Sequence, residues 1–593
     1  RGAGRRACCE ARARAAMQSD LEIARGATLL PLEEVAAKVG LTAAELAPRA
    51  EGVAKLRWSA LKERMIDCGG GGGGKRGSMV LVTGVNPTPF GEGKTVTTIG
   101  LSQALCRAGE SAFCVIREPS MGPVFGVKGG AAGGGYSQVL PMDSINLHFT
   151  GDLHAITSAH NLLSSMVDNH IKHGNAERID AQRVFWPRVL DLNERALRQC
   201  VIGLGGAANG APREERFDIT AASEVMAILA LAQDYKDLKA RLARIVVAQR
   251  VDGTPVTASD LRADGAMALL LKDALLPNFV QTYEGDPALV HCGPFANIAH
   301  GNSSVVADRV ALGCADYVVT EAGFGSDMGA EKFFNIKASS SGALPDCVVI
   351  AVTVRAMKLH GGAFGPKPTR PDPEIVKQLD EPAARKGAST NLARHVSNMA
   401  RFGAPVVVAV NRFPTDHQAE VDALLEEART AGATAAVVSN VHSQGGKGGA
   451  ELAAAVKAAC AAHAEAGRPH TPLFAKDAPV ITKVETIAKE IYGASGVELS
   501  SKAQAELKRL KRWGLDTLPV CMAKTQYSFS DNPNALGSPS GFVVPVKELR
   551  LNAGAGFVVA ILGSVMTMPG LPAEPAAVNM HLSDDGELVG VFG

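Results

Sequence analysis

The sequence predicts an α/β protein in which helices flank a mostly parallel sheet. The first observation is that short apolar runs alternate with longer helical stretches along most of the 593 residues. The second is a glycine-rich turn between one apolar run and the following helix. Hydrophobic residues are 46% and charged residues 20% of the chain, so it can bury the core that this fold needs.

Each apolar run is expected to be a buried strand, because strands covered by helices on both faces are apolar throughout. These runs are residues 79–85, 112–116, 245–248, 317–319, 347–354, 406–410, 435–438 and 519–522. The predicted helices between them include 96–108, 223–234, 238–242, 391–401, 418–431 and 449–466. This order of elements predicts a parallel sheet with helices on both faces.

The glycine-rich turn is residues 88–95, and it has the composition of a phosphate-binding loop. Backbone N–H groups of such a turn and the positive end of the next helix face an anion. Lys94 can reach the outer phosphates of a nucleotide, and the Thr95 hydroxyl can bind magnesium. The usual pattern begins with glycine, where this chain has Thr88. The residues expected to bind a nucleoside triphosphate are Thr88, Pro89, Phe90, Gly91, Glu92, Gly93, Lys94 and Thr95.

The length predicts several domains. Residues 17–360 are expected to form a large, P-loop NTPase-like nucleotide-binding domain, followed by two smaller α/β domains at 361–480 and 481–593. Residues 1–16 contain five arginines and one acidic residue. They are either the remnant of a transit peptide or sequence upstream of a start at Met17. We therefore expect a cytoplasmic protein, or a mitochondrial or plastid one if residues 1–16 belong to a transit peptide.

Charge and cysteine content exclude several classes of partner. The formal net charge is +1, which gives no general electrostatic case for nucleic acid or membrane partners. No apolar stretch is long enough to span a bilayer. The eleven cysteines have no Cys-x-x-Cys spacing, so they are interpreted as buried thiols in a reducing compartment.

Arg117 directly follows the predicted strand 112–116, at the sheet edge where ligands bind in open α/β folds. If that strand lies beside 79–85, Arg117 is near the phosphates held by Lys94. Its planar guanidinium suits a carboxylate, a phosphate or an acyl phosphate. A surface ion pair with Glu118 is an equal alternative.

Two phenylalanines, Phe324 and Phe413, lie on loops that also follow predicted strands. Aromatic residues are only 5% of the chain, so rings at these positions favour stacking on a flat heterocycle. The alternative is that both rings fill the core. A third such loop carries His442 within Val441-His-Ser-Gln-Gly-Gly-Lys-Gly448.

Taken together, these motifs resemble those of formate–tetrahydrofolate ligases, also called 10-formyltetrahydrofolate synthetases. The motifs that carry the resemblance are residues 88–95, 117–123, 129–136, 146–152, 293–301, 321–331, 522–531 and 566–572. They follow the family order from about residue 20 to the end of the chain. The resemblance is to the monofunctional form, because only 87 residues precede Thr88.

The resemblance implies ATP-dependent ligation of formate to tetrahydrofolate through formyl phosphate, giving 10-formyltetrahydrofolate, ADP and phosphate. It implies Mg²⁺ with the ATP, K⁺ or NH₄⁺ as activator, polyglutamylated tetrahydrofolate as substrate, and a homodimer or tetramer. Lys94 and Arg117 take the catalytic positions and Thr95 the metal position. The positions that line the folate site are Phe324, Phe413 and His442. At His442 the family often has tryptophan, which puts the folate affinity in doubt.

A P-loop switch that controls a partner is the alternative from another class. A GTP-binding switch needs a guanine-reading Asn-Lys-x-Asp, which the fragment beginning at Asn411 does not supply. A switch also explains neither Arg117 nor the two loop phenylalanines. A third alternative, an inactive structural relative, is disfavoured because Lys94, Thr95 and Arg117 are all present.

Overall fold

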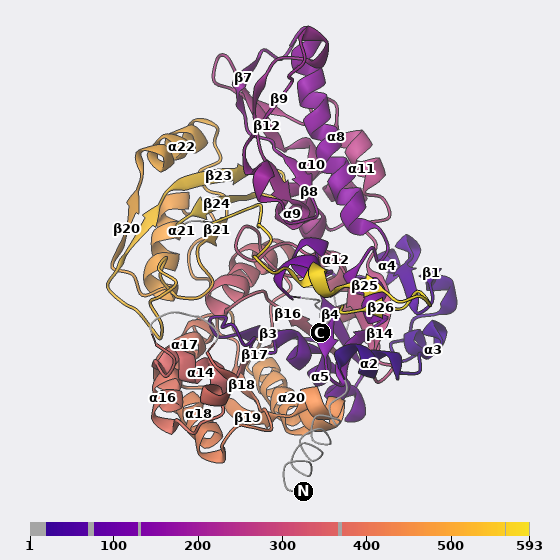
Figure 1. Cartoon of the computed structure of the whole chain (residues 1–593), viewed down its shortest axis with the longest axis vertical. Helices are drawn as coiled ribbons and strands as arrows, with labels where there is room; N and C mark the ends of the chain where they lie inside the picture. The colour runs from indigo at the N-terminus through magenta and orange to yellow at the C-terminus, as the bar shows by residue number, and fades with distance from the viewer. Residues whose placement is uncertain (1–18, 69–75, 129–131, 366–370, 564, 592–593) are drawn as a thin grey trace, which may run out of the picture.

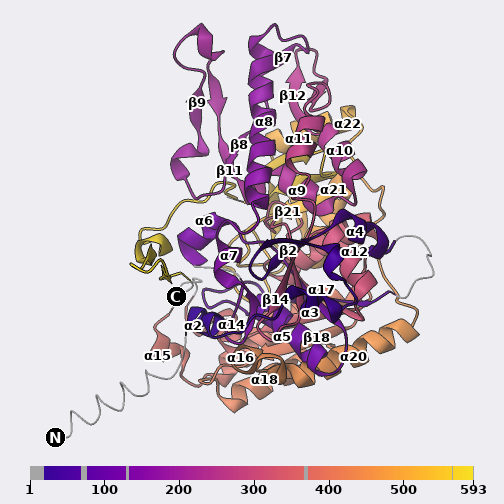
Figure 2. The same cartoon turned by 90° about the vertical axis from the view of Figure 1, so that its right-hand side faces the viewer.

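The computed structural model describes residues 19–68, 76–128, 132–365, 371–563 and 565–591 (Figures 1 and 2). The predicted transit remnant at 1–16 lies outside these residues. In the part of the chain that is described, no helix is long and apolar enough to cross a membrane. A large, mostly parallel sheet flanked by helices confirms the predicted α/β class.

The main sheet has the strand order β1-β2-β14-β15-β4-β16-β3-β17-β18-β19. Its parallel part is β15 (Pro287–Val290), β4 (Ala112–Ile116), β16 (Tyr317–Glu321), β3 (Ser78–Gly84), β17 (Cys347–Val352), β18 (Val406–Asn411) and β19 (Ala435–Ser439). The antiparallel edge is β14 (Asn278–Thr282), β2 (Val53–Leu56) and β1 (Leu46–Ala50), and β6 (Ser137–Leu140) also pairs with β14. The apolar runs thus predicted six of the parallel strands, but not the antiparallel edge.

The strand at 112–116 does not lie directly beside the strand at 79–85, the condition under which Arg117 was expected near Lys94. Strand β16 lies between β4 and β3, and its Val319 is opposite Cys114 on one side and Val80 on the other. The hydrophobic pattern marks which segments become buried strands. It does not record the place of each strand in the sheet, because all three strands are equally buried.

Helices cover both faces of the sheet, as predicted. Leu101 of α5 (Lys94–Arg107) and Val456 of α20 (Ala450–Glu465) share a core with Val80 of β3. Helices α12 (Val305–Cys314), α17 (Ala393–Ala400) and α18 (Gln418–Thr430) belong to the core on the other face. Other helices include α2 (Asp20–Arg25), α3 (Leu32–Ala37), α4 (Trp58–Arg64), α7 (Met142–Asn146), α9 (Glu224–Leu231), α10 (Tyr235–Ala243), α11 (Asp264–Leu270), α14 (Val354–Gly361), α16 (Glu381–Gly387) and α21 (Val480–Thr486).

Two smaller sheets lie outside the main sheet. The first, β13-β12-β7, lies beside the long helix α8 (Asp152–Lys172) at the top of Figure 1. Its strands are β7 (Ile179–Val184), β12 (Val246–Arg250) and β13 (Pro255–Thr257). The second, β21-β24-β23, comes from the C-terminal part of the chain and lies against α22 (Ser501–Arg512). Its strands are β21 (Val520–Ala523), β24 (Phe557–Ile561) and β23 (Glu548–Asn552).

The runs 245–248 and 519–522 are therefore strands of these smaller sheets. Short pairs complete the strands: β8 (Arg188–Leu190) with β11 (Phe217–Ile219), β9 (Cys200–Ile202) with β10 (Arg213–Glu215), and β20 (Gly496–Leu499) with β22 (Val543–Val546). Strands β18 and β19, from the segment 361–480, continue the main sheet. The division into three domains stays a prediction.

Candidate functional site

The predicted phosphate-binding loop, residues 88–95 and called the phosphate loop below, connects β3 to α5 at the carboxyl edge of the main sheet. Gly91 and Gly93 have φ of +75° and +73°, which side chains rarely adopt. A Cβ at Gly93 would also lie 2.8 Å from Nδ2 of Asn411. Thr88, where the usual pattern has glycine, donates from its backbone N and its hydroxyl to Oε1 of Glu92 at 2.6 and 2.9 Å. Thr88 therefore stabilises the loop from inside.

Lys94 and Thr95 form the first turn of α5. The Lys94 ammonium lies 3.5 Å from Oε2 of Glu92, and 15% of its side chain is exposed. The Thr95 hydroxyl donates to Oε2 of Glu321 at 2.6 Å. A hydroxyl beside a carboxylate at a phosphate loop offers the oxygen ligands that Mg²⁺ prefers. Among the described residues, no group of three or more His, Cys, Asp or Glu side chains could hold a metal by itself.

Arg117 reaches the same carboxylate from the other side. Its Nε and Nη2 each lie 3.3 Å from Oε1 of Glu321, which ends β16. The exposed fractions are 25% for the Arg117 side chain and 6% for that of Glu321. The strand inserted between β4 and β3 thus carries the acid that joins Arg117 to Thr95. We call Lys94, Thr95, Arg117 and Glu321 the Glu321 cluster.

Glu118, the alternative partner of Arg117, lies elsewhere. It is buried, and burial raises the pKa of its carboxyl well above the usual value, with a further increase from nearby Asp152. The loop after β16 packs on Arg117 instead. A Cβ at Gly323 would come within 2.9 Å of the Arg117 Nη1, so a side chain there would displace the guanidinium.

Phe324 follows this close approach and has φ of +60°, a strained value for a bulky residue. Such strain persists where the surrounding structure imposes it, and it is concentrated at functional sites. The ring is half-buried, so it does not fill the core. The structure therefore brings Phe324 next to Arg117, as expected if both belong to one site.

Phe413 and His442 leave neighbouring strands but make different contacts. The guanidinium of Arg355 lies 3.8 Å from the centre of the Phe413 ring. The Nε2 of His442 lies 4.0 Å from Oδ1 of Asp20, and its carbonyl accepts from the backbone N of Tyr136 at 2.8 Å. His442 is 60% exposed at its side chain, on the side of α2 and the Gly135 turn.

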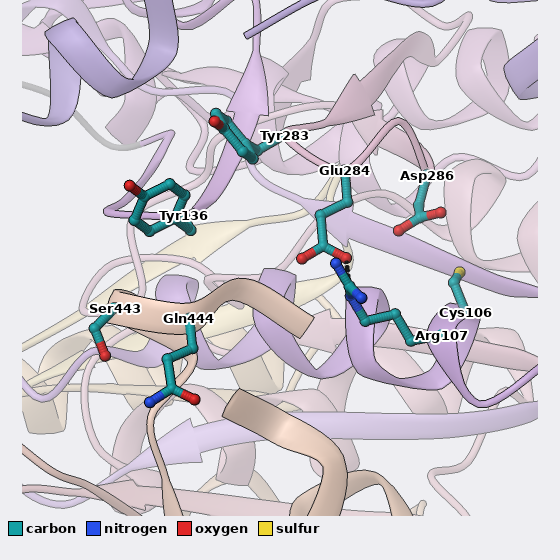
Figure 3. Close-up of a pocket in the computed structure, with 8 residues that line it drawn as sticks. All are labelled: Cys106, Arg107, Tyr136, Tyr283, Glu284, Asp286, Ser443 and Gln444. Atoms are coloured by element: carbon teal, nitrogen blue, oxygen red, sulfur yellow. Dashed lines mark hydrogen bonds and ion pairs between the residues drawn. The ribbon is translucent and has the colours of Figure 1, made fainter. Parts of the chain in front are cut away.

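A cavity of about 550 Å³ opens beside the His442 loop (Figure 3). It lies at the C-terminal end of α5, about 20 Å along the helix from Lys94. Its charges are already paired, since Glu284 accepts from Arg107 at 2.6 Å and from the backbone N of Gly446 at 2.9 Å. A helix C-terminus is also unfavourable for anions. This cavity is therefore no candidate for the phosphate site.

A buried polar network supports the phosphate loop from the C-terminal side of the molecule. Lys524, after β21, forms a 2.7 Å ion pair with Asp327, and both side chains are fully buried. Asn86, two residues before Thr88, donates from Nδ2 to Oδ1 of Asp327 at 3.2 Å. Its backbone N donates to Nε2 of His395 at 2.9 Å, and Nδ1 of His395 lies 2.7 Å from Oγ of Ser326.

Burial lowers the pKa of His395 to about 3, so this ring is neutral. Because Nε2 accepts the Asn86 N–H, the proton lies on Nδ1 and is donated to Ser326. The five residues Asn86, Ser326, Asp327, His395 and Lys524, here called the Asp327 network, fix the start of the phosphate loop relative to the Phe324 turn.

Glu321, Asn411 and the Asp327 network are not among the site residues predicted from the sequence. Glu321 and Asn411 end apolar strands, the same position that drew attention to Arg117, and this signal could have identified them. Asn411 donates to the carbonyl of Glu92 and to the Thr97 hydroxyl at 2.9 Å. Lys524 and Asp327 lie in the quoted motifs, but nothing in their spacing indicates that they meet.

Comparisons with known proteins agree with this geometry. A family model described as formate–tetrahydrofolate ligase matches residues 18–592. A relative from Paracoccus denitrificans is 54% identical over 576 residues, which is 97% of this chain and all of the relative. Relatives from a Roseiflexus species and from Methylobacterium nodulans are 52% identical over 576 and 578 residues, with the same coverage. All three are named formate–tetrahydrofolate ligase.

Proposed function

The chain belongs to the formate–tetrahydrofolate ligase family, and we propose that it makes 10-formyltetrahydrofolate in two steps at the Glu321 cluster. A formate oxygen attacks the γ-phosphorus of ATP, the bond to the β-phosphate oxygen breaks, and ADP leaves. The folate amine then attacks the carbonyl carbon of formyl phosphate. The C–O bond to phosphate breaks, and the amine proton is lost to solvent.

The observation that carries this proposal is the double contact of Glu321. Its carboxylate accepts a hydrogen bond from Thr95, in the phosphate loop after β3. The same carboxylate lies 3.3 Å from Arg117, which follows β4 on the other side of β16. An arginine fork at this place suits formate and then formyl phosphate. The nucleotide and the one-carbon acid would thus be held on the two sides of a single side chain.

Lys94 would hold the γ-phosphate and neutralise the charge that develops on its oxygens. Thr95 and Glu321 would hold the Mg²⁺ that accompanies ATP, and the metal would supply further charge neutralisation. In the structure Lys94 lies near Glu92 at 3.5 Å, longer than a hydrogen bond, so its ammonium is free to turn toward a phosphate.

Phe324 and Phe413 would contact the flat pterin, and His442 would meet a more distant part of the folate. The strained Phe324 turn beside Arg117 supports this assignment, because a formyl phosphate held by Arg117 would lie near this half-buried residue. Activation by K⁺ or NH₄⁺, the preference for polyglutamylated folate, and assembly as a dimer or tetramer stay predictions from the family resemblance.

The test is ADP formation by the purified protein, with formate and tetrahydrofolate omitted in turn. We expect ADP release to require formate and 10-formyltetrahydrofolate to appear only when both are present. ADP release that is unchanged without formate would overturn the proposal.

A further inference from the structure

A second cavity, of about 370 Å³, lies between the small sheet β21-β24-β23 and the small sheet β13-β12-β7. Helix α22 and strand β23, which are neighbours in Figure 1, contribute one wall through Lys502, Arg509 and Leu549. The segment 184–187 after β7 and residues 216–224 form the other. Ligand cavities are common at such junctions, and this volume is sufficient for a small molecule. We call it the inter-sheet cavity, and none of the phosphate-loop residues lines it.

Two arginines that line this cavity have buried donors without a partner. The Nε–H groups of Arg509, on α22, and of Arg216 are buried and donate to no acceptor among the described residues. Arg216 Nε is 3.6 Å from Oδ1 of Asp218, too far for a hydrogen bond. The Arg509 guanidinium lies over the rings of Phe185 and Trp513, at 4.9 and 5.4 Å from their centres. Buried donors of this kind call for an acceptor.

The other charged groups of the lining already have partners. Lys502 and Arg550 share one carboxylate, Glu548, at 3.1 and 3.0 Å. Glu224 accepts from the backbone N of Gly554 at 2.8 Å, and Glu506 accepts from the backbone N of Leu549 at 2.7 Å. The Nε–H groups of Arg216 and Arg509 are thus the buried side-chain donors of this lining that lack an acceptor among the described residues.

The rest of the lining is apolar and aromatic. Phe185, Trp186 and Trp513 present rings, and Ile298 and Val559 are among the aliphatic residues. A ligand that fills the cavity must therefore combine an anionic group with a flat apolar body. Arg509 covers one face of Phe185 and of Trp513, and His160 stacks on Trp186, so the remaining ring surface provides apolar contact. The two arginines provide charge-assisted hydrogen bonds.

We propose that the inter-sheet cavity binds a small aromatic anion, a carboxylate or a phosphate monoester, through Arg509 and Arg216. The bound anion would also contact Ile298. Ile298 belongs to the loop 293–301, whose Ala296 packs at Gly323 beside Arg117. The occupant would therefore touch the same loop that supports the Glu321 cluster, although the site is separate from it.

The chain offers a direct spectroscopic test, because two of its three tryptophans, Trp186 and Trp513, line the cavity. In a Trp58→Phe protein, only these two report. Phenyl phosphate and 4-hydroxybenzoate are titrated separately while tryptophan fluorescence is followed. We expect a saturable change with a Kd below about 1 mM for at least one probe, and the better probe tells phosphate from carboxylate.

Variants of the same protein locate the binding. Arg509→Met and Arg216→Met should each weaken binding by at least about tenfold, the usual effect of losing a charged hydrogen bond. Arg512→Met, an exposed position on the same helix, is the matched control and should change nothing. The proposal is overturned if neither probe gives a saturable change up to about 10 mM. Equal affinity in folded Arg509→Met and in wild type would also overturn it, and Arg216→Met decides if Arg509→Met does not fold.

Discussion

The Glu321 cluster and the Asp327 network both lie at the carboxyl edge of the main sheet. They differ in how exposed their cations are and in how closely their ion pairs approach. In the cluster, Lys94 and Arg117 are partly exposed, and their carboxylate partners lie at 3.5 and 3.3 Å. In the network, Lys524 and Asp327 are fully buried and only 2.7 Å apart. Loose, accessible pairs can exchange partners with a substrate, whereas a tight buried pair cannot.

This difference assigns the two groups different tasks. A buried ion pair that loses one partner leaves an uncompensated charge, so its members act on stability and on the position of their neighbours. In the Glu321 cluster the carboxylates are buried but the cations are partly exposed, so Lys94 and Arg117 can turn toward a substrate, and we assign them to the reaction. The predictions below test this division, starting with the largest expected effect.

Lys524→Met should destabilise the protein by about 3–5 kcal/mol, because the fully buried Asp327 carboxylate loses its ion-pair partner. The measurement is the urea midpoint of unfolding. In the double variant Lys524→Met with Asp327→Leu, most of the loss should be recovered, because no charge is left unpaired. A Lys524→Met protein as stable as wild type would show that the Lys524–Asp327 ion pair does not stabilise the fold.

Lys94→Ala should leave the urea midpoint close to that of wild type and reduce formate-dependent ADP formation by about 10²–10³-fold, equivalent to about 2.7–4 kcal/mol. The reason is the loss of a positioned cation at the γ-phosphate. Lys239→Ala, on an exposed surface of α10, is the control and should retain full activity. Near-normal turnover of a folded Lys94→Ala protein would remove this lysine from the site.

Acid should destabilise the protein through the Asp327 network. Burial lowers the pKa of His395 to about 3, against about 6.5 when unfolded, so between these values the unfolded chain binds the extra proton. The free energy of unfolding should therefore fall, as pH decreases below about 6.5, by about 1.4 kcal/mol per pH unit from this residue.

A His395→Gln variant separates the contribution of His395 from that of other buried groups. Glu331, whose pKa burial raises to about 7, acts in the opposite direction, because its contribution is lost as pH rises from about 4.5 to 7. His395→Gln should retain the contribution of Glu331 to the pH dependence of stability and lose the contribution of His395. Relative to the midpoint at pH 7, the urea midpoint at pH 5 should thus be higher in His395→Gln than in wild type; an unchanged difference between the two pH values would contradict the account.

His442→Trp should have the smallest effect. A tryptophan at this position would add stacking worth roughly 0.5–1.5 kcal/mol, so the Michaelis constant for tetrahydrofolate should fall several-fold, with those for ATP and formate unchanged. His442 faces Asp20 and is largely exposed, which favours the opposing interpretation that the ring does not reach the folate. An unchanged folate constant would establish that interpretation.

The fold class was predictable from sequence because the parallel strands are apolar on both faces, as β17 shows over all six of its residues. The antiparallel edge was missed, since β2 contains Lys55, whose burial depends on an ion pair with Asp152 far along the chain. The hydrophobic pattern also does not predict that β16 lies between β4 and β3. This order is set by tertiary packing between strands of equal burial.

The candidate site was predictable where one segment contains the chemistry, as in Thr88–Thr95. It was not predictable where distant segments meet. Glu321 gains its role only because β16 lies between β3 and β4, and Lys524 gains its role from a contact across 197 positions of the chain with Asp327. For His442 the family pattern predicts a folate contact, which stays a prediction; in the structure the residue lies beside α2.

The most direct test of the division between accessible and buried charges is Arg117→Lys, with formate-dependent ADP formation and the urea midpoint measured on the same protein. Lysine keeps the charge but loses the planar fork. Arg107→Lys is the matched control, an ion-paired arginine at the other end of α5. We predict that Arg117→Lys loses at least about tenfold in kcat/KM for formate with little change in the midpoint, while Arg107→Lys changes neither. Wild-type kcat/KM in the folded Arg117→Lys protein would contradict the account.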